Sequence, residues 1–157
     1  MAHSDLWVYA EDNDIERVQI PTAVGGRYAV FSAVGLLPLC ALGLDADVLR
    51  LGAQNMRDLC LSNDPNKNPA FVSAVIQWCH YQQGKTISDH FYFHPELESL
   101  GRWYRQLMGE SIGKDGKGIT PVVSIGSTDL HSIAQLNLDG PRDKFTAFVW
   151  SPTDTKN

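Results

Sequence analysis

Three short segments combine an ionisable side chain with glycines or with a helix end, and these are the places where the chain could do chemistry. They are residues 24–28 (VGGRY), 109–114 (GESIGK) and 127–132 (STDLHS). In α/β proteins, ligands bind where strands end and helices begin, and we expect each segment to occupy such a junction. Together they offer a guanidinium, a carboxylate and an imidazole, which can stabilise negative charge and transfer protons.

The first segment places two glycines before an arginine. Gly25 and Gly26 allow the backbone to turn sharply and to approach a ligand closely, and Arg27 adds a fixed cation that can stabilise developing negative charge. An isolated G-G-R is more often an ordinary strand-to-helix turn with a surface arginine. The segment alone therefore leaves both interpretations open.

The second segment is close to a phosphate-binding P-loop but departs from it twice. The spacing from Gly109 to Gly113 and Lys114 is one residue too short, and Asp115 stands where Ser or Thr would bind magnesium. We therefore reject nucleotide binding. Glu110 remains, just beyond a helix that we expect to end at Gly109, where its carboxylate can act as a general base. The alternative is an ordinary solvated glutamate in a loop.

The third segment contains Ser127, Asp129 and His131, which invites comparison with a hydrolase triad. Neighbours in sequence rarely form a triad and the chain has no G-x-S-x-G elbow, so we reject that interpretation. We expect Ser127 or Thr128 to cap a helix with His131 in its first turn. The imidazole can exchange protons near neutral pH, or it can simply line the helix.

No segment predicts a metal site or another cofactor. His90 and His94 are four residues apart, but the residues between them, 91–93 (FYF), suggest a strand, where that spacing does not converge on one ion as it would on a helix. The three cysteines include no C-x-x-C pair. We therefore expect neither a metal nor another cofactor.

Stretches of helical and strand-like character alternate along the chain. Helical spacing of apolar residues, or a run that is apolar nearly all round and predicts a buried helix, occurs at 28–44, 45–60, 69–84 and 95–109. Strands are predicted at 6–10, 17–20, 86–93, 119–125 and 144–150. This order predicts an α/β fold, a three-layer sandwich with a mostly parallel sheet, in a single domain over residues 1–157.

Composition narrows the classes of partner. The net charge of −5, with basic residues scattered among carboxylates, argues against a nucleic-acid partner. No apolar run approaches the roughly 18 to 20 residues that span a bilayer, so we expect no membrane association. The odd set Cys40, Cys60 and Cys79 suggests reduced thiols packed in a core, which fits a soluble protein of the cytoplasm.

Taken together and in this order, the three segments resemble the second sugar isomerase (SIS) domain of bacterial glucose-6-phosphate isomerases. The matching stretches are residues 24–36, 106–118 and 127–132 with Gln135, and the likeness covers about residues 20–149. Three ordered motifs are far more specific than any one of them. The resemblance implies a doubly wound SIS-like fold. It also implies an aldose–ketose isomerase of glycolysis and gluconeogenesis, which interconverts glucose 6-phosphate and fructose 6-phosphate through a cis-enediolate.

The resemblance also implies a role for each matching residue. Glu110 would be the base that moves a proton between C1 and C2 of the open-chain sugar, and Arg27 would stabilise the enediolate. His131 would assist ring opening, reaching the active site of the other subunit of a homodimer. Gly26 would allow a close backbone approach to the substrate, and Gln106 would lie near its phosphate.

The family's remaining parts are expected to be absent from this chain. These are the first SIS domain, which binds the phosphate, and the C-terminal helix, whose lysine shares the ring opening. We therefore expect the chain alone to be inactive, with the first SIS domain and a second copy as partners. A sugar-phosphate sensor without turnover and an assembly module are the alternatives. Arg27, Glu110 and His131 favour the enzyme, because a sensor has no use for a base that attacks carbon.

Overall fold

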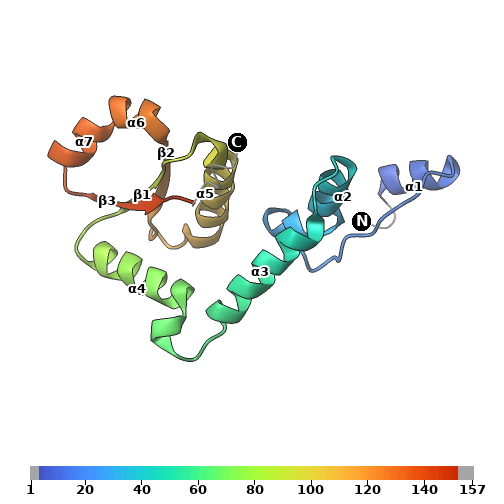
Figure 1. Ribbon diagram of the computed structural model, residues 1–157, viewed down its shortest axis with the longest axis horizontal. Coiled ribbons are helices and arrows are strands. Elements are labelled where there is room, and N and C mark those ends of the chain that lie inside the picture. The colour runs from blue at the N-terminus through green and yellow to red at the C-terminus, as the bar shows by residue number, and fades with distance from the viewer. Residues whose placement is uncertain (1–3, 152–157) are drawn as a thin grey trace. The chain divides into compact units, whose positions relative to one another are not determined.

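A computed structural model describes residues 4–151 (Figure 1). The chain divides into two compact units, one ending at Asn68 and the other beginning at Pro69. Within the described residues, no helix is both long and apolar enough to cross a membrane. We call the two parts the N-terminal unit and the C-terminal unit.

The N-terminal unit is helical throughout its regular structure. Side chains cap the three α-helices of its described part: Ser4 accepts a hydrogen bond from Trp7 N, Ser32 from Val34 N, and Asp45 from the amides of Asp47 and Val48. The predicted helix after Asp45 is thereby confirmed. The elements are α1 (Asp5–Asp12), the 3-10 helix η1 (Gly26–Phe31), α2 (Ala33–Ala41), α3 (Ala46–Cys60) and the 3-10 helix η2 (Pro65–Lys67).

The two strands predicted near the N-terminus are wrong. Residues 6–10 lie in α1, and residues 17–20 have no regular structure. A helix satisfies its own backbone hydrogen bonds whereas a strand needs a partner strand, and the Ser4 cap starts the helix. Arg17 packs back on α1 instead, with an ion pair to Glu11 at 3.2 Å and its guanidinium 5.0 Å from the centre of the Trp7 ring.

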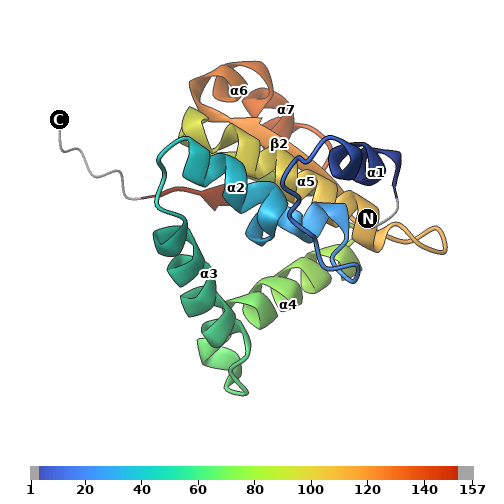
Figure 2. The same ribbon diagram turned by 90° about the vertical axis from the view of Figure 1, so that its right-hand side faces the viewer.

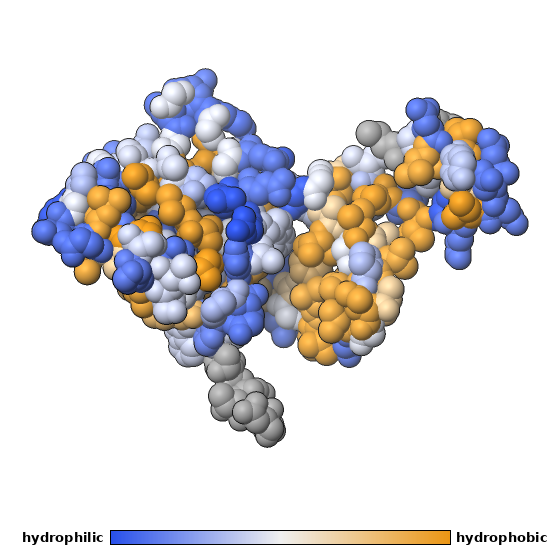
Figure 3. All heavy atoms as spheres, turned by 90° about the horizontal axis from the view of Figure 1, so that it is seen from above, coloured by the Kyte–Doolittle hydropathy of each residue, from blue (hydrophilic) through white to orange (hydrophobic). Residues whose placement is uncertain are grey.

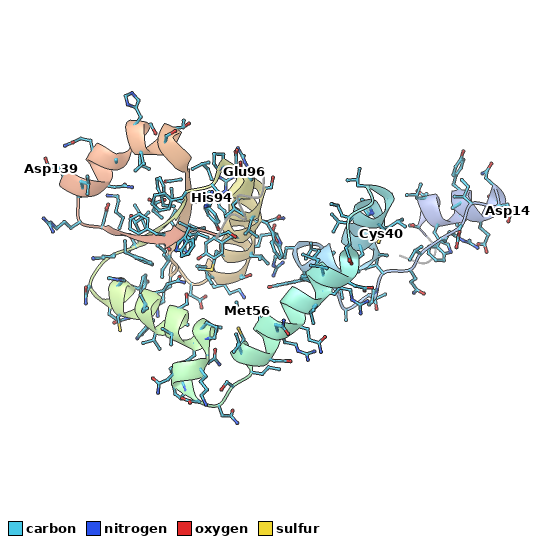
Figure 4. The ribbon with its side chains drawn as sticks, viewed as in Figure 1. Asp14, Cys40, Met56, His94, Glu96 and Asp139 are labelled. Carbon is cyan, nitrogen blue, oxygen red and sulfur yellow. The ribbon has the colours of Figure 1, made fainter. Side chains whose placement is uncertain are left out.

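The apolar stretch 28–44 is not one buried helix. It is divided at Ser32, whose hydroxyl donates to the Ala29 carbonyl and accepts from Val34 N. Most large apolar side chains of α2 and its C-terminal turn are exposed, and hydrophobic surface gathers over this part of the unit in Figure 3. Cys40 on α2, labelled in Figure 4, is exposed and so is Cys79, which contradicts the prediction that the thiols are packed in a core.

The C-terminal unit is a parallel sheet with helices on both faces, which confirms the predicted α/β class and three-layer order. The strand order is β2-β1-β3, and both pairings are parallel. Figure 1 shows α6 and α7 on one side of the sheet and α4 on the other. The elements are α4 (Pro69–Gln82), β1 (Ile87–Tyr92), the 3-10 helix η3 (Pro95–Leu97), α5 (Glu98–Ile112), β2 (Thr120–Ile125), α6 (Gly126–Ser132), α7 (Ala134–Asp139) and β3 (Lys144–Val149).

Side chains of β1 alternate between the two helical layers. Tyr92 faces α5, where a Cβ built on Gly101 would lie 2.8 Å from the Tyr92 ring and 2.7 Å from Val123. Glycine at 101 therefore lets α5 lie close against the sheet. Asp89 faces the opposite layer, where its carboxylate accepts a hydrogen bond from Asn137 of α7 at 3.0 Å.

Two helix ends differ from the prediction. The helix expected to stop at Gly109 continues to Ile112, because an exposed glycine with space around its Cα can be accommodated inside a helix. The helix expected to be capped by Ser127 or Thr128 begins at Gly126, and its N-cap residue is Ile125. Both differences move a predicted site residue relative to its helix.

Candidate active site

Glu110 and Gln106 lie one turn apart near the end of α5. The Gln106 side-chain amide donates a hydrogen bond of 3.0 Å to Glu110 Oε1, and both side chains are exposed. The sequence predicted Glu110 in a loop beyond the helix, whereas it lies inside the last turn. The helical backbone and the Gln106 amide therefore fix the carboxylate more firmly than a loop would.

The junction between β2 and α6 is built around a glycine in a left-handed conformation. Gly126 has a φ of +52°, and a Cβ there would lie 3.4 Å from Pro95 Cγ and 3.8 Å from the Phe93 carbonyl oxygen. A side chain would therefore be strained at this turn. The turn brings α6 off the end of β2, beside the chain that leaves β1.

Asp129 ties this junction together. Its Oδ2 accepts a hydrogen bond of 2.6 Å from the backbone amide of Ile125, and its Oδ1 accepts one of 3.1 Å from the Ser132 hydroxyl. His131 lies between these contacts, exposed, in the last turn of α6. The predicted first-turn position of His131 is therefore wrong, because the helix begins at Gly126 and is only seven residues long.

Glu110 and His131 lie towards opposite ends of the parallel strands. Because α5 connects two parallel neighbours, it runs antiparallel to them, and it ends near the start of β2. His131 is on the helix that leaves the other end of β2, and six residues of strand span about 17–20 Å. In Figure 2 the turn after α5 (gold) and helix α6 lie well apart. Of the two, only His131 follows the carboxyl end of a strand, so the junction predicted for Glu110 is wrong.

Arg27 and Gly26 begin η1 in the N-terminal unit. Arg27 is half-buried, with its guanidinium carbon 4.9 Å from the centre of the Tyr28 ring. A Cβ built on Gly26 would have no heavy atom within 4 Å, and its φ is not in the left-handed region. The local fold therefore places no demand for glycine at 26, which leaves room for a ligand to approach the backbone.

A buried carboxylate at the centre of the sheet was missed by sequence reasoning. Asp89 is 1% exposed and accepts hydrogen bonds from Ser124 at 2.7 Å, Asn137 at 3.0 Å and Thr146 at 3.5 Å. The donors come from β2, α7 and β3, so one carboxylate joins three elements to the central strand. The signal was an aspartate in the middle of an otherwise strand-like run.

On the opposite face of β1, His90 packs between the sheet and α5. Its ring centre lies 4.1 Å from that of Tyr104, and its Nδ1 is 3.3 Å from the Ser88 hydroxyl. Burial lowers the pKa of His90, although the neighbouring Asp89 charge and the Ser88 backbone act in the opposite direction. Burial also raises the pKa of the Tyr104 hydroxyl. These groups belong to the packing between β1 and α5.

Comparison with known proteins gives the chain a clear set of relatives. The phosphoglucose isomerase family model matches residues 12–131. The glucose-6-phosphate isomerase of Methanocaldococcus jannaschii is 44% identical to this chain, over 89% of this chain and 35% of its own length. The glucose-6-phosphate isomerase of Clostridium novyi is 42% identical, over 90% of this chain and 31% of its own length. The crystal structure of a hypothetical protein from Thermus thermophilus matches 92% of this chain and 35% of its own at 32% identity, with a TM-score of 0.84. The chain thus spans about a third of the length of these relatives.

Proposed function

The chain belongs to the phosphoglucose isomerase family, and we propose that it forms the second SIS domain of an enzyme that interconverts glucose 6-phosphate and fructose 6-phosphate. The observation that carries the proposal is the span of the family match. Residues 12–131 include Arg27, Glu110 and His131, the three groups that the reaction needs. The proposed setting is glycolysis and gluconeogenesis in the cytoplasm.

Glu110 is the proposed base of the isomerisation. Its carboxylate removes the proton from C2 of the open-chain aldose, and the electron pair of that C–H bond forms the C1–C2 double bond while O1 takes the negative charge. The O2 hydroxyl proton passes to O1, and the same carboxylic acid then returns its own proton to C1 as the C2 carbonyl forms. Gln106, hydrogen-bonded to Glu110 Oε1 at 3.0 Å, orients the carboxylate and lies near the substrate phosphate.

Arg27 is the proposed cation for the enediolate. A guanidinium carries its charge at every working pH and donates several hydrogen bonds in a fixed plane, which suits an oxyanion that exists only between the two proton transfers. Partial burial strengthens its electrostatic effect. Gly26 precedes it and leaves the backbone open for the sugar.

His131 is the proposed acid and base of ring opening, and it would act in a second copy of the chain. Within one C-terminal unit, Glu110 and His131 lie towards opposite ends of the parallel strands. One copy of the chain therefore does not bring the two side chains into a single site. A homodimer supplies the histidine to the partner's Glu110. The first SIS domain is the other proposed partner, because it would hold the phosphate at a helix N-terminus.

The test is a chimera in which this chain replaces the matching third of the Methanocaldococcus jannaschii relative. We expect the chimera to convert glucose 6-phosphate to fructose 6-phosphate, measured by a coupled assay in both directions. The matched comparison is the same chimera with Glu110→Gln. A folded chimera that binds glucose 6-phosphate without turnover would overturn the proposed isomerase activity and favour a sugar-phosphate sensor.

A further inference from the structure

Helix α6 lacks the features that usually stabilise a short helix. It has seven residues, its N-cap is Ile125, and the Ile125 side chain cannot accept a hydrogen bond from the first turn. Helices shorter than about 12–15 residues are marginal unless other contacts hold them. An exposed side chain on such a helix is only as well placed as the helix itself.

The Asp129 carboxylate supplies the missing contacts. One oxygen accepts from the Ile125 amide at 2.6 Å, which fixes the start of α6 to the last residue of β2. The other accepts from the Ser132 hydroxyl at 3.1 Å, which fixes its last turn. A single side chain thus links the strand to both ends of the helix.

The backbone continues this arrangement into α7. The Asp129 carbonyl accepts from the Ile133 amide at 3.0 Å, and Asn137 of α7 donates to the buried Asp89 at 3.0 Å. Both ends of the α6–α7 segment are therefore tied to the sheet, through Asp129 at its start and through Asn137 at its end. His131 sits between the two anchors.

We propose that Asp129 is a positioning residue for His131: it holds α6 so that the imidazole projects in the one direction that a ring-opening acid and base requires. This inference rests on the proposed function of His131, but its structural half can be tested without activity. Asp129 itself needs no contact with the substrate. Its effect reaches the reaction only through the histidine two residues away.

The first measurement uses the full chain and no substrate. In Asp129→Ala, we expect the Ile125 amide to lose protection from hydrogen exchange, and the NMR order parameter of the His131 backbone to fall from about 0.85 to about 0.6 or below. The amides of β1 should keep their protection. An unchanged order parameter at His131 would overturn the proposal, whatever the activity of the enzyme.

The matched control is Asp139→Asn. Asp139 is the same residue type at the outer end of α7, where its side chain is exposed (Figure 4). This variant should leave both the Ile125 exchange rate and the His131 order parameter as they are in the wild type. Asp129→Asn retains one acceptor oxygen, so its Ile125 exchange rate and His131 order parameter should lie between those of the wild type and Asp129→Ala.

The second measurement is a double-mutant cycle in the chimera. We expect Asp129→Ala to lower kcat by about 10- to 100-fold, because small misplacements of a catalytic group have effects of that size. When His131 is already Ala, the same change should cost no more than about twofold. Equal losses in the two backgrounds would overturn the proposal, since Asp129 would then act by another route. An inactive chimera would count against the proposed function, while the order parameter would still decide the positioning role.

Discussion

Gln106 and Glu110 form a hydrogen-bonded pair across one turn of α5, with the amide nitrogen 3.0 Å from the carboxylate oxygen. The amide donor occupies one lone pair of that oxygen and adds no charge beside it. It also restricts the rotamers of Glu110, so less entropy is lost when a substrate arrives. The pair thus holds the carboxylate in a defined orientation at the end of α5.

The carboxylate of Glu110 can be tested by removing only its charge. We expect Glu110→Gln to lower kcat of the chimera by about 10³-fold, because a positioned general base contributes 10²–10⁴-fold. Glu98→Gln is the matched control, since Glu98 is also on α5 and also pairs one turn away, with Arg102. A Glu110→Gln variant with full activity would remove Glu110 from the reaction.

The left-handed turn at Gly126 should be sensitive to a single methyl group. Gly126→Ala places a Cβ at a φ of +52°, and we expect the free energy of unfolding of the C-terminal unit to fall by about 1–2 kcal/mol. Gly109→Ala is the control, because nothing lies within 4 Å of its Cβ position in α5, and it should gain up to about 1 kcal/mol. Urea unfolding followed by circular dichroism gives both values. Equal effects of the two changes would contradict this account of the turn.

Loss of the Asp89 carboxylate should be the most damaging change in the sheet. Asp89→Ala leaves three donors without their acceptor, and we expect a loss of about 3 kcal/mol or more in the free energy of unfolding. Asp139→Asn, at an exposed position, should stay within about 0.5 kcal/mol of the wild type. The same urea titration measures both. A small effect at Asp89 would mean that water replaces the carboxylate.

His90 should make stability depend on pH. Burial lowers its pKa below the unfolded value of 6.5, so the proton binds the unfolded chain more tightly. The contribution of His90 is therefore present above pH 6.5 and is lost as the pH falls from there through the folded-state pKa. We expect His90→Gln to flatten the decline in the free energy of unfolding between pH 7.5 and pH 5.5. An identical decline in the variant would assign the effect to other groups.

The secondary structure of the C-terminal unit could be predicted because its patterns are local and mutually consistent. The run 86–93 is bounded by Gly84 and Pro95, and the structure has β1 at Ile87–Tyr92. Gly84 has a φ of +81° and follows α4 as predicted. Parallel pairing followed from the alternation of strands and helices.

The predictions that were wrong or missing depend on contacts between residues, which a local sequence pattern does not encode. The stretch 6–10 has strand-like composition, but the described residues of its own unit contain no strand, and the Ser4 cap favours a helix. Helix α6 begins at Gly126, before the hydroxyl residues, so the side chain that accepts a hydrogen bond at its start, from the Ile125 amide, is Asp129 rather than Ser127. The partners of Asp89 are 35, 48 and 57 residues away, and no local signal joins them.

Those long separations have a consequence for translation. The Asp89 carboxylate leaves the ribosome well before its donors, and the last of them, Thr146, follows 57 positions later. At about 5–20 residues per second, the nascent chain carries this charge without its native partners for several seconds. A pause or premature stop before β3 would leave the central strand with one side unpaired. Chaperones should therefore matter most for this chain during the interval between the synthesis of β1 and that of β3.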